Sequence, residues 1–395
     1  MSAAPPAMPA ARAAAPRQTR VMVVDDAIVA RSLVARWVAD EPDLEIVATA
    51  RTGLEAVNEV ERARPDVVVL DIDMPELDGL STLPQLLEKK RDLVVIMAST
   101  LTRRNADASL KALSLGAADY IPKPETEGGI ITSSDYHREL IEKIRAFGQR
   151  RIQFDAQTHK SEIKPSSHVD ATIPMQKPGK PRVAVSEGQR AAISLRPFSP
   201  IPPRVLLIGA STGGPQALVE ILPRLQPGLD HAPILITQHM PPTFTVIFAE
   251  NLTRVCGRPV HEAVDGEPVL AGGIYLAPGG RHMQVTRRNG TAVIALVDGP
   301  PINFCRPAVD PLFVSGAEVW GSSSLALVMT GMGSDGLRGA EEIVAAGGSV
   351  IAQDEATSVI WGMPGSVAEA GLCSAVLPLD QIASATVRLF QGSPV

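Results

Sequence analysis

The sequence predicts two doubly wound α/β domains, each built on a parallel sheet, that are joined by a proline-rich linker. Short β-branched runs alternate with helical patterns over residues 20–140 and again over 203–395. The chain has 395 residues, which is too long for one ordinary domain. Residues 141–202 hold the end of a helix and then prolines, serines and lysines without an apolar period, as in a linker. Residues 1–19, rich in Ala and Pro, predict a disordered tail.

The composition fits buried parallel strands and excludes several functional classes. Hydrophobic residues make up 45% of the chain but aromatic residues only 4%, so the core consists mainly of aliphatic side chains. A net charge of -6 argues against broad electrostatic binding to nucleic acid or anionic lipid. Three well-separated cysteines predict neither a disulfide framework nor a zinc site. No apolar run approaches the about 20 residues that span a bilayer, so we expect a cytoplasmic protein without membrane insertion.

The first domain shows regular alternation of strands and helices. Strands are predicted over residues 21–24, 45–50, 66–70, 93–98 and 119–121. Helices are predicted around residues 29–37, over 53–62, in a segment that ends near Gly116, and over 134–149. Polar residues follow several of the strands, and the carboxyl ends of parallel strands are where open α/β sheets place their sites.

Three carboxylates fall at two strand ends of this domain. Asp25 and Asp26 end the first strand, and Asp71 ends the third. Adjacent strand ends would bring them together, which is costly unless a cation neutralises them. A hard divalent ion, most simply Mg²⁺, suits oxygen ligands. A carboxylate beside Mg²⁺ can attack phosphorus and hold an acyl phosphate.

Further side chains could contact such a phosphoryl group. Ser99 and Thr100 end the next strand, and Lys123 lies between two prolines. Any single aspartate at a strand end is more often a solvated cap, but the joint pattern is specific. The strings VVDD, LDIDMPELDG, MAST and GAADYIPKP occur in order.

With these strings, residues 20–140 resemble the receiver domains of response regulators, with a flavodoxin-like fold. The resemblance implies that Asp71 is the phospho-acceptor. It implies Mg²⁺ ligation by Asp25, Asp26, Asp71 and the carbonyl of Asp73, and phosphoryl-dependent switching through Ser99, Tyr120 and Lys123.

In the second domain a serine lies between a strand and a helix. Strands are predicted over residues 205–208, 234–237, 273–276, 293–297, 326–329 and 349–353. Ser211 follows the first of these within IGASTGGP, which fits the G-x-S-x-G pattern of an exposed nucleophile before a helix. A phosphate-binding loop is the alternative, although GxGxxG and GxxxxGK[ST] are both absent.

A nucleophilic serine needs a base and a group that orients the base. His239 closes the next strand and would emerge at the same sheet edge as Ser211; His282 is the second choice. Asp335 lies in a glycine-rich turn after a later strand, where it could orient the base or simply cap a helix. The backbone N–H of Met332 in that turn could stabilise an oxyanion. The chain order Ser, His, Asp differs from that of α/β-hydrolases.

From residue 204 to about 390 the chain resembles the CheB-type protein-glutamate methylesterase domain, with a Rossmann-like fold. The resemblance rests on IGASTGGP, QHMPP, APGGRHM, CRPAVDPLF, TGMGSDG and DEATSVIWGMPGSV. It implies Ser211 as nucleophile, His239 as base and acid, Asp335 as the orienting carboxylate and Met332 as the oxyanion contact. The pair Phe304-Cys305 departs from the family pattern, which could tune substrate fit.

The combined resemblance implies a phosphorylation-activated hydrolase that demethylates glutamate methyl esters on chemoreceptors, and could deamidate receptor glutamines, in chemotactic adaptation. It implies Mg²⁺ for receiver phosphorylation, no cofactor for the hydrolase site, and a chemotaxis histidine kinase of the CheA type as phosphoryl donor. Two alternatives are a receiver-controlled serine hydrolase acting on another ester or amide, and a non-enzymatic response regulator. The acidic charge and the lack of a helix-turn-helix signature argue against a DNA-binding regulator.

Overall fold

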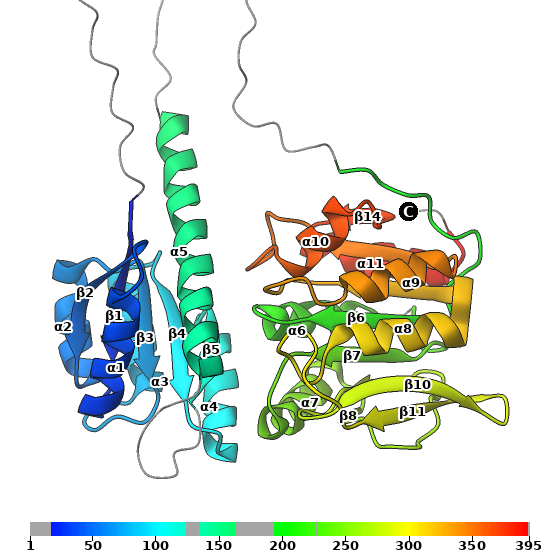
Figure 1. Cartoon of the computed structure of the whole chain (residues 1–395), viewed down its shortest axis with the longest axis horizontal. Coiled ribbons are helices and arrows are strands. Elements are labelled where there is room, and N and C mark those ends of the chain that lie inside the picture. Colours follow the sequence, from blue (N-terminus) through cyan, green and yellow to red (C-terminus); the bar gives the residue numbers. More distant parts are fainter. Residues whose placement is uncertain (1–16, 124–133, 163–192, 226–227, 394–395) are drawn as a thin grey trace, which may run out of the picture.

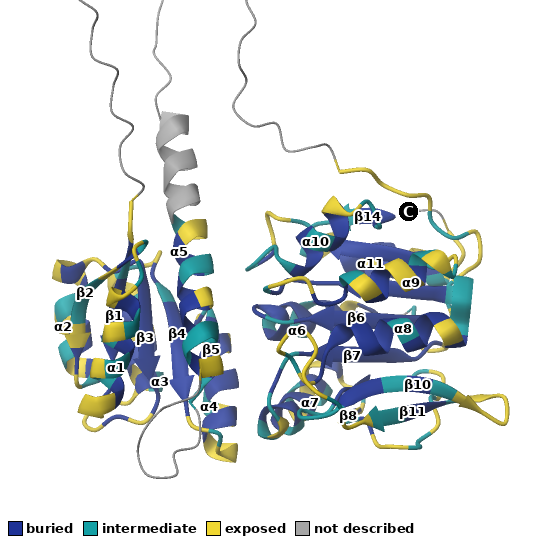
Figure 2. Cartoon of the chain, in the orientation of Figure 1, coloured by how far each residue is buried: buried dark blue, intermediate teal, exposed yellow. Residues whose placement is uncertain are grey.

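The computed structural model describes residues 17–123, 134–162, 193–225 and 228–393. They form two α/β domains that lie side by side (Figure 1). Most of the predicted tail and the linker stretch 163–192 lie outside the described residues. In both domains helices cover the two faces of a parallel sheet, and the strands are the most buried elements (Figure 2). The predicted fold class is therefore confirmed.

The first domain has five parallel strands in the order β2-β1-β3-β4-β5. Its elements are β1 (Thr19–Val24), α1 (Ile28–Ala39), β2 (Leu44–Ala50), α2 (Gly53–Ala63), β3 (Val67–Asp71), α3 (Gly79–Lys89), β4 (Val94–Ser99), α4 (Arg103–Ser114), β5 (Asp119–Pro122) and α5 (Ser134–Glu162). This is the flavodoxin-like order, in which β1 and β3 are neighbours. The carboxyl ends of β1 and β3 therefore meet, and with them the aspartates that follow or end those strands.

Two helices of the first domain differ from expectation. The helix α3 was not predicted, although Asp78 supplies its N-cap by accepting a hydrogen bond from the Ser81 N–H at 2.7 Å. Pro84 inside this helix obscures its periodicity. The helix α5 runs on to Glu162, beyond the predicted end at residue 149, because no proline or glycine interrupts the chain between Gly148 and Pro165.

The second domain has a seven-stranded sheet in the order β14-β13-β12-β6-β7-β9-β8. Its elements are β6 (Val205–Ala210), α6 (Gly214–Leu225), β7 (Ile234–Gln238), α7 (Pro242–Cys256), β8 (Val260–Glu262), β9 (Ile274–Leu276), β10 (His282–Arg288), β11 (Thr291–Val297), α8 (Val309–Trp320), η1 (Gly321–Ser323), β12 (Ser324–Val328), α9 (Leu337–Ala345), β13 (Ser349–Gln353), α10 (Met363–Glu369), β14 (Ala375–Leu377) and α11 (Leu379–Phe390). All the pairings in this sheet are parallel.

The strand predicted over residues 293–297 has a different place from that expected. It belongs to β11, which pairs antiparallel with β10 as a separate two-stranded ribbon. The ribbon packs against α8 beside the main sheet. The order in which the chain adds strands to the main sheet reverses at β6, which has β7 on one side and β12 on the other. The ends of these three strands are where a doubly wound sheet places its ligand.

The two domains meet through α4, β5 and α5 of the first domain. The helix α4 packs against α6 and α7 (Figure 1). The buried rings of Tyr120 and Phe244 stack across this boundary, with centroids 4.7 Å apart. At the edge, Arg103 pairs with Glu250 at 2.8 Å. One buried apolar cluster includes residues of both domains, so the contact is continuous with the two cores.

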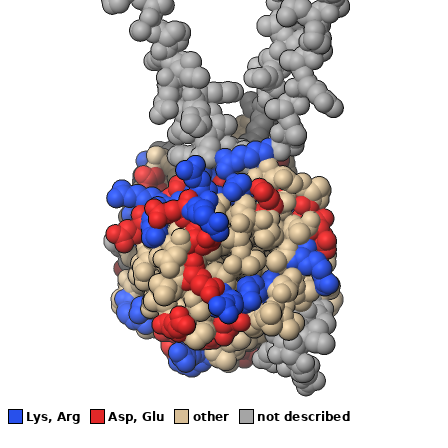
Figure 3. All heavy atoms as spheres, turned by 90° about the vertical axis from the view of Figure 1, so that its left-hand side faces the viewer, with Lys and Arg blue, Asp and Glu red and all other residues tan. Residues whose placement is uncertain are grey.

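The outer face of the first domain carries mixed charge. Figure 3 shows basic and acidic side chains interspersed over this face, without a broad field of either sign. Such a surface offers no extended electrostatic footprint for a polyanion. Within the part of the chain that the structure describes, every helix is too short or too polar to cross a bilayer.

Candidate active site

Ser211 lies directly after β6, in the turn that leads into α6. Its N–H donates to the Thr330 carbonyl at 3.1 Å, which ties the turn to the end of β12. The turn requires glycine at two places. Gly213 has φ +76°, and a Cβ atom on Gly331 would come within 2.9 Å of the Ser211 Cβ. These glycines allow the backbone to turn sharply and leave the serine side chain at the sheet edge.

His239 follows β7, the strand beside β6, and Asp335 lies in the turn after β12. The structure brings these two residues together: Nε2 of His239 is 2.7 Å from Oδ2 of Asp335. The same oxygen accepts the Val309 N–H at 2.6 Å, and Oδ1 accepts the N–H groups of Asp310 and Gly336. The carboxylate is thus fixed by the backbone, and it fixes the imidazole ring. The Cys305 side chain is a second neighbour of the ring.

Gln238 links the serine turn to the histidine. Its Nε2 donates to the Ser211 carbonyl at 2.9 Å and to the His239 carbonyl at 3.3 Å. Among the described residues no hydrogen bond joins the Ser211 hydroxyl to His239. Catalytic hydrogen bonds of this kind often form only when substrate is bound. Ser211 and His239 nevertheless line one cavity.

Two neighbouring buried carboxyls have opposite pKa shifts. Burial works against ionisation of Asp335, but its hydrogen bond with His239 and those from the backbone hold its pKa below the usual range. Burial raises the pKa of Asp310, and the charge of Asp335 raises it further; the N–H of Gly339 opposes this. The pair therefore favours an ionised Asp335, which is the state that can orient an imidazole.

The pKa of His239 depends on Cys305 as well as on Asp335. Burial disfavours the charged ring, but the Cys305 sulfur and the Asp335 carboxylate outweigh burial and raise the pKa to about 10. Cys305 lies partly buried on the cavity wall. A base must be neutral to accept a proton, so this neighbour affects how much of the base is ready at a given pH.

Met332 and His282 have different surroundings from the triad candidates. Met332 lines the cavity beside Ser211, and the hydrogen bonds among the described residues leave its N–H without an acceptor, as an oxyanion donor requires. His282 is buried in β10, where Nε2 lies 3.0 Å from the Pro300 carbonyl and Nδ1 accepts the Ala308 N–H. Both nitrogens of His282 are occupied structurally, so the second-choice histidine is set aside.

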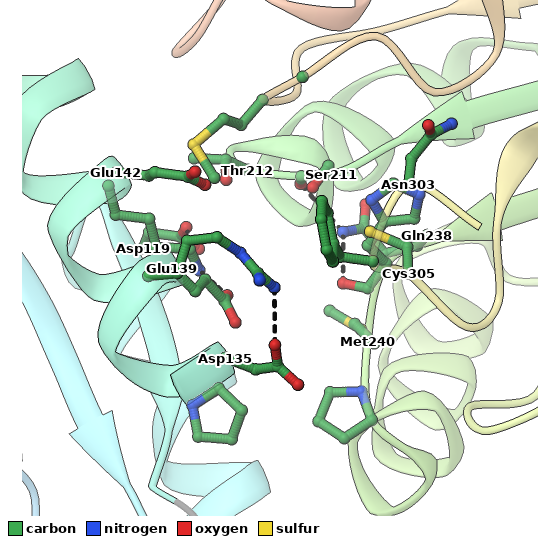
Figure 4. A pocket seen from close by; sticks show the side chains of 18 of the residues that line it. Asp119, Asp135, Glu139, Glu142, Ser211, Thr212, Gln238, Met240, Asn303 and Cys305 are labelled. Atoms are coloured by element: carbon green, nitrogen blue, oxygen red, sulfur yellow. Dashed lines mark hydrogen bonds and ion pairs between the residues drawn. The ribbon is translucent and has the colours of Figure 1, made fainter. Parts of the chain in front are cut away.

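The cavity lies between the two domains and has a volume of about 470 Å³. Ser211, Asn303 and Cys305 form one wall, and acidic side chains of α5 face them from the other wall (Figure 4). These acidic residues are Asp135, Glu139 and Glu142. The first domain therefore covers the candidate active site.

A buried lysine stabilises the wall contributed by the first domain. Nζ of Lys143 lies 2.8 Å from Asp119, 2.9 Å from Glu139 and 2.7 Å from the Tyr120 carbonyl. Burial opposes the charge, but the two carboxylates raise the pKa of Lys143. The network joins β5 to α5, and so holds α5 in position over the cavity.

At the carboxyl ends of β1 and β3 in the first sheet, Asp25, Asp26 and Asp71 meet as predicted. One carboxylate oxygen from each lies within 4.8 Å of the others. Nζ of Lys123 is 2.8 Å from both Asp25 and Asp71. Burial raises the pKa of Asp71 to about 6, against the effect of Lys123. Burial also opposes the charge on Lys123, whose pKa the two carboxylates raise.

These carboxylates fit a hard divalent cation such as Mg²⁺. Three converging oxygen donors with one lysine carry excess negative charge, which a cation would relieve. The Asp73 side chain points elsewhere, accepting from Asn105 Nδ2 at 2.5 Å, so only its carbonyl remains as the predicted ligand. The Ser99 hydroxyl is buried and accepts from Ser109 on α4 at 2.9 Å.

The sequence did not single out several residues of the second site. Gln238 precedes His239 in the motif QHMPP, but it was assigned no role in the site from the sequence. Asn303 donates weakly to Asp310 at 3.4 Å and to Asp335 at 3.3 Å, and Asp335 lies 32 residues further along the chain. The position of Asp310 in CRPAVDPLF was a signal, but its contact with the Asp335 turn depends on the tertiary fold.

The comparisons with known proteins match both domains. The sequence profile for the CheB methylesterase matches residues 206–386, and that for the response regulator receiver domain matches 21–134. A protein-glutamate methylesterase/protein-glutamine glutaminase of Rhodopseudomonas palustris (strain BisB5) is 58% identical, over 99% of both chains. One of group 2 operon from Bradyrhizobium diazoefficiens is also 58% identical, over 94% of each.

Solved structures match each domain separately. The crystal structure of the Thermotoga maritima CheB methylesterase catalytic domain is 42% identical, covers 48% of this chain and 100% of its own, and has a TM-score of 0.46. The response regulator domain of Thermotoga maritima CheB is 36% identical, covers 35% of this chain and 98% of its own, and has a TM-score of 0.30.

Proposed function

Because this chain belongs to the protein-glutamate methylesterase/protein-glutamine glutaminase family, we propose that it hydrolyses glutamate methyl esters on chemoreceptors in the cytoplasm. The observation that carries this proposal is that Ser211 and His239 line one cavity at neighbouring strand ends, while the buried Asp335 holds His239 from behind at 2.7 Å. Receptor glutamine amides are a second substrate class, because ester and amide pass through the same kind of tetrahedral intermediate.

The first half of the reaction forms an acyl-enzyme and releases methanol. The Ser211 oxygen attacks the ester carbonyl carbon as Nδ1 of His239 takes the serine proton. Asp335, held at Nε2, stabilises the imidazolium that forms. The N–H of Met332 donates to the oxyanion. The carbon–oxygen bond to methoxide then breaks, and His239 delivers the proton to the departing oxygen.

The second half regenerates the enzyme with water. His239 takes a proton from water, whose oxygen attacks the acyl carbon. The bond to Ser211 breaks, the serine regains a proton from His239, and a glutamate side chain is released. No step requires a redox change or an external co-reactant other than water.

The receiver domain controls access to this site. Its helix α5 forms one wall of the cavity, where the rest of a protein substrate would have to lie. We assign Asp71 as the phospho-acceptor, with Mg²⁺ held by Asp25, Asp26, Asp71 and the carbonyl of Asp73. The donor is a chemotaxis histidine kinase of the CheA type. Phosphorylation draws Lys123, Ser99 and Tyr120 into new contacts, and Tyr120 forms part of the domain boundary.

The experiment that tests this proposal follows individual receptor side chains by mass spectrometry. Methylated chemoreceptors are incubated with wild type or Asp71→Asn, with and without a phosphoryl donor and Mg²⁺. We expect conversion of glutamyl esters to glutamate by both proteins, and acceleration by the donor only in wild type. Acceleration of Asp71→Asn would contradict the assigned acceptor, and unchanged esters with wild type would contradict the substrate.

A further inference from the structure

A strained turn at the rim of the cavity holds an aromatic side chain outward. Ile302 and Cys305 exchange two backbone hydrogen bonds of 3.0 and 2.8 Å, which closes a two-residue turn at Asn303 and Phe304. Both turn residues have positive φ, +50° for Asn303 and +64° for Phe304. Turns of this kind favour Asn-Gly, because the second position suits glycine. Among the described residues, Phe304 is the one aromatic residue with positive φ.

The strain at Phe304 does not improve the packing of the core. The side chain is 76% exposed, the highest exposure of any large hydrophobic residue in the described chain. A bulky residue at positive φ is costly, and such strain is typically retained at functional sites. Burial of the ring therefore cannot explain why the turn carries Phe where Gly would fit without strain.

The turn is anchored to the catalytic machinery. The Asn303 side chain lies within 3.3 Å of the Asp335 carboxylate, and Cys305 is next to His239. The Arg306 guanidinium donates to the Gly299 carbonyl at 2.8 Å, which holds the base of the loop. The ring of Phe304 thus has a fixed place on the rim of the cavity that Ser211 lines.

A residue of the receiver domain contacts the Phe304 ring. The guanidinium carbon of Arg138, on α5, lies 3.8 Å from the centroid of the Phe304 ring. Asp135, one turn earlier on α5, pairs with Arg138 at 2.9 Å and holds it there. A cation over an aromatic face is attractive and can be exchanged for an apolar partner. Displacement of α5 would free the face of the ring that Arg138 occupies and leave it open to any substrate that enters.

From these contacts we infer that Phe304 is a specificity-determining residue, which packs against an apolar side chain of the receptor segment that carries the ester. This inference rests on the proposed function. On a helical substrate, residues three or four positions from the modified glutamate share its face, so one of them would reach the rim when the ester reaches Ser211. Arg138 occupies one face of the ring while the receiver is docked and the rest of the ring stays exposed, and the receptor replaces Arg138 when the receiver moves.

The test compares two substrates and uses Phe304→Gly, since glycine also removes the strain. The substrates are methylated chemoreceptor and the small ester p-nitrophenyl acetate, and the readout is the ratio of their kcat/KM values. We expect Phe304→Gly to lower this ratio about tenfold, mostly through the KM for receptor, as for an interface anchor. Its unfolding temperature should equal or exceed that of wild type. Leu270→Ala, which removes an exposed side chain on the loop before β9, is the matched control and should keep the wild-type ratio.

The variant Arg138→Ala tests the role of the Arg138–Phe304 contact independently. It should raise receptor demethylation in the absence of a phosphoryl donor and have little effect in its presence, because Arg138 has then already left the face of the ring. An unchanged ratio in Phe304→Gly, with wild type active on receptor, would overturn the inference alone. A wild type that hydrolyses p-nitrophenyl acetate but leaves methylated receptor untouched would overturn the proposed function and this inference with it.

Discussion

Tyr120 of the receiver and Phe244 of the catalytic domain lie ring to ring, with centroids 4.7 Å apart and planes inclined by only 6°. Because β5 places Tyr120 at the domain boundary, its side chain packs against α7, the helix that follows His239. The residue assigned to the phosphoryl switch is therefore also part of the contact that keeps α5 over the active site.

Tyr120→Ala should raise basal methylesterase activity. Loss of the stacked pair removes about 0.5–1.5 kcal/mol from the domain contact, which corresponds to a two- to tenfold change in the open population. Initial rates of demethylation without a phosphoryl donor measure this change. Tyr120→Phe keeps the stack and should behave as wild type in the same assay; equal activation by both substitutions would rule out the stack as the cause.

The ion pair between Arg103 and Glu250 offers a charge-swap test of the same contact. The pair joins α4 to α7 at 2.8 Å and is more than half exposed, so we expect a contribution of about 0.2–1 kcal/mol. Arg103→Glu and Glu250→Arg should each raise basal activity by up to about fivefold. The double variant should return to the wild-type rate, whereas additive activation would show that the two residues act independently.

Asp335→Asn should nearly abolish catalysis. An amide at this position cannot stabilise the imidazolium of His239, and loss of a triad carboxylate typically lowers kcat by about 10⁴-fold. Asp310→Asn is the matched variant, because Asp310 contacts the Asp335 turn without touching His239. We expect its kcat to fall far less. Steady-state hydrolysis of a small ester decides the point, and comparable losses in the two variants would contradict the assigned role.

The pH profile of the esterase should depend on Cys305. With the pKa of His239 at about 10, the neutral base becomes more abundant, and the rate rises, as pH increases towards that value. Cys305→Ala removes one of the groups that raise this pKa. The acid limb should then move to lower pH, and the rate at pH 7 should rise about tenfold for every pH unit by which the limb moves. The acid limb of Cys305→Ser should lie between those of wild type and Cys305→Ala. Superimposable pH profiles for wild type and Cys305→Ala would exclude an effect of Cys305 on the pKa of His239.

Strand-end reasoning located the triad candidates from sequence, because neighbouring parallel strands end at one edge of the sheet. Ser211 and His239 directly follow β6 and β7, Asp335 lies in the turn between β12 and α9, and these strands are adjacent. The aspartates of the receiver followed from the same argument, with β1 beside β3. Local patterns were sufficient wherever a side chain lies within one or two residues of a buried strand.

The missed features depend on contacts between distant segments. The ribbon of β10 and β11 is held by pairing and by α8, and the arginines of β10 masked its strand pattern. Asn303 reaches Asp335 through a turn with positive φ that composition does not reveal. The family resemblance implies that the receiver packs near the active site, but the residues of α5 that form the cavity wall depend on how the two sheets face each other, which no local pattern specifies.

Release of methanol from methylated chemoreceptor membranes tests the central claim most directly. Wild type and Ser211→Ala are compared, each with and without acetyl phosphate and Mg²⁺. We expect release by wild type that increases with the phosphoryl donor, and no release by Ser211→Ala in either condition. Methanol release by Ser211→Ala at the wild-type rate would contradict the assigned nucleophile, and a wild type without any release would contradict the assigned substrate.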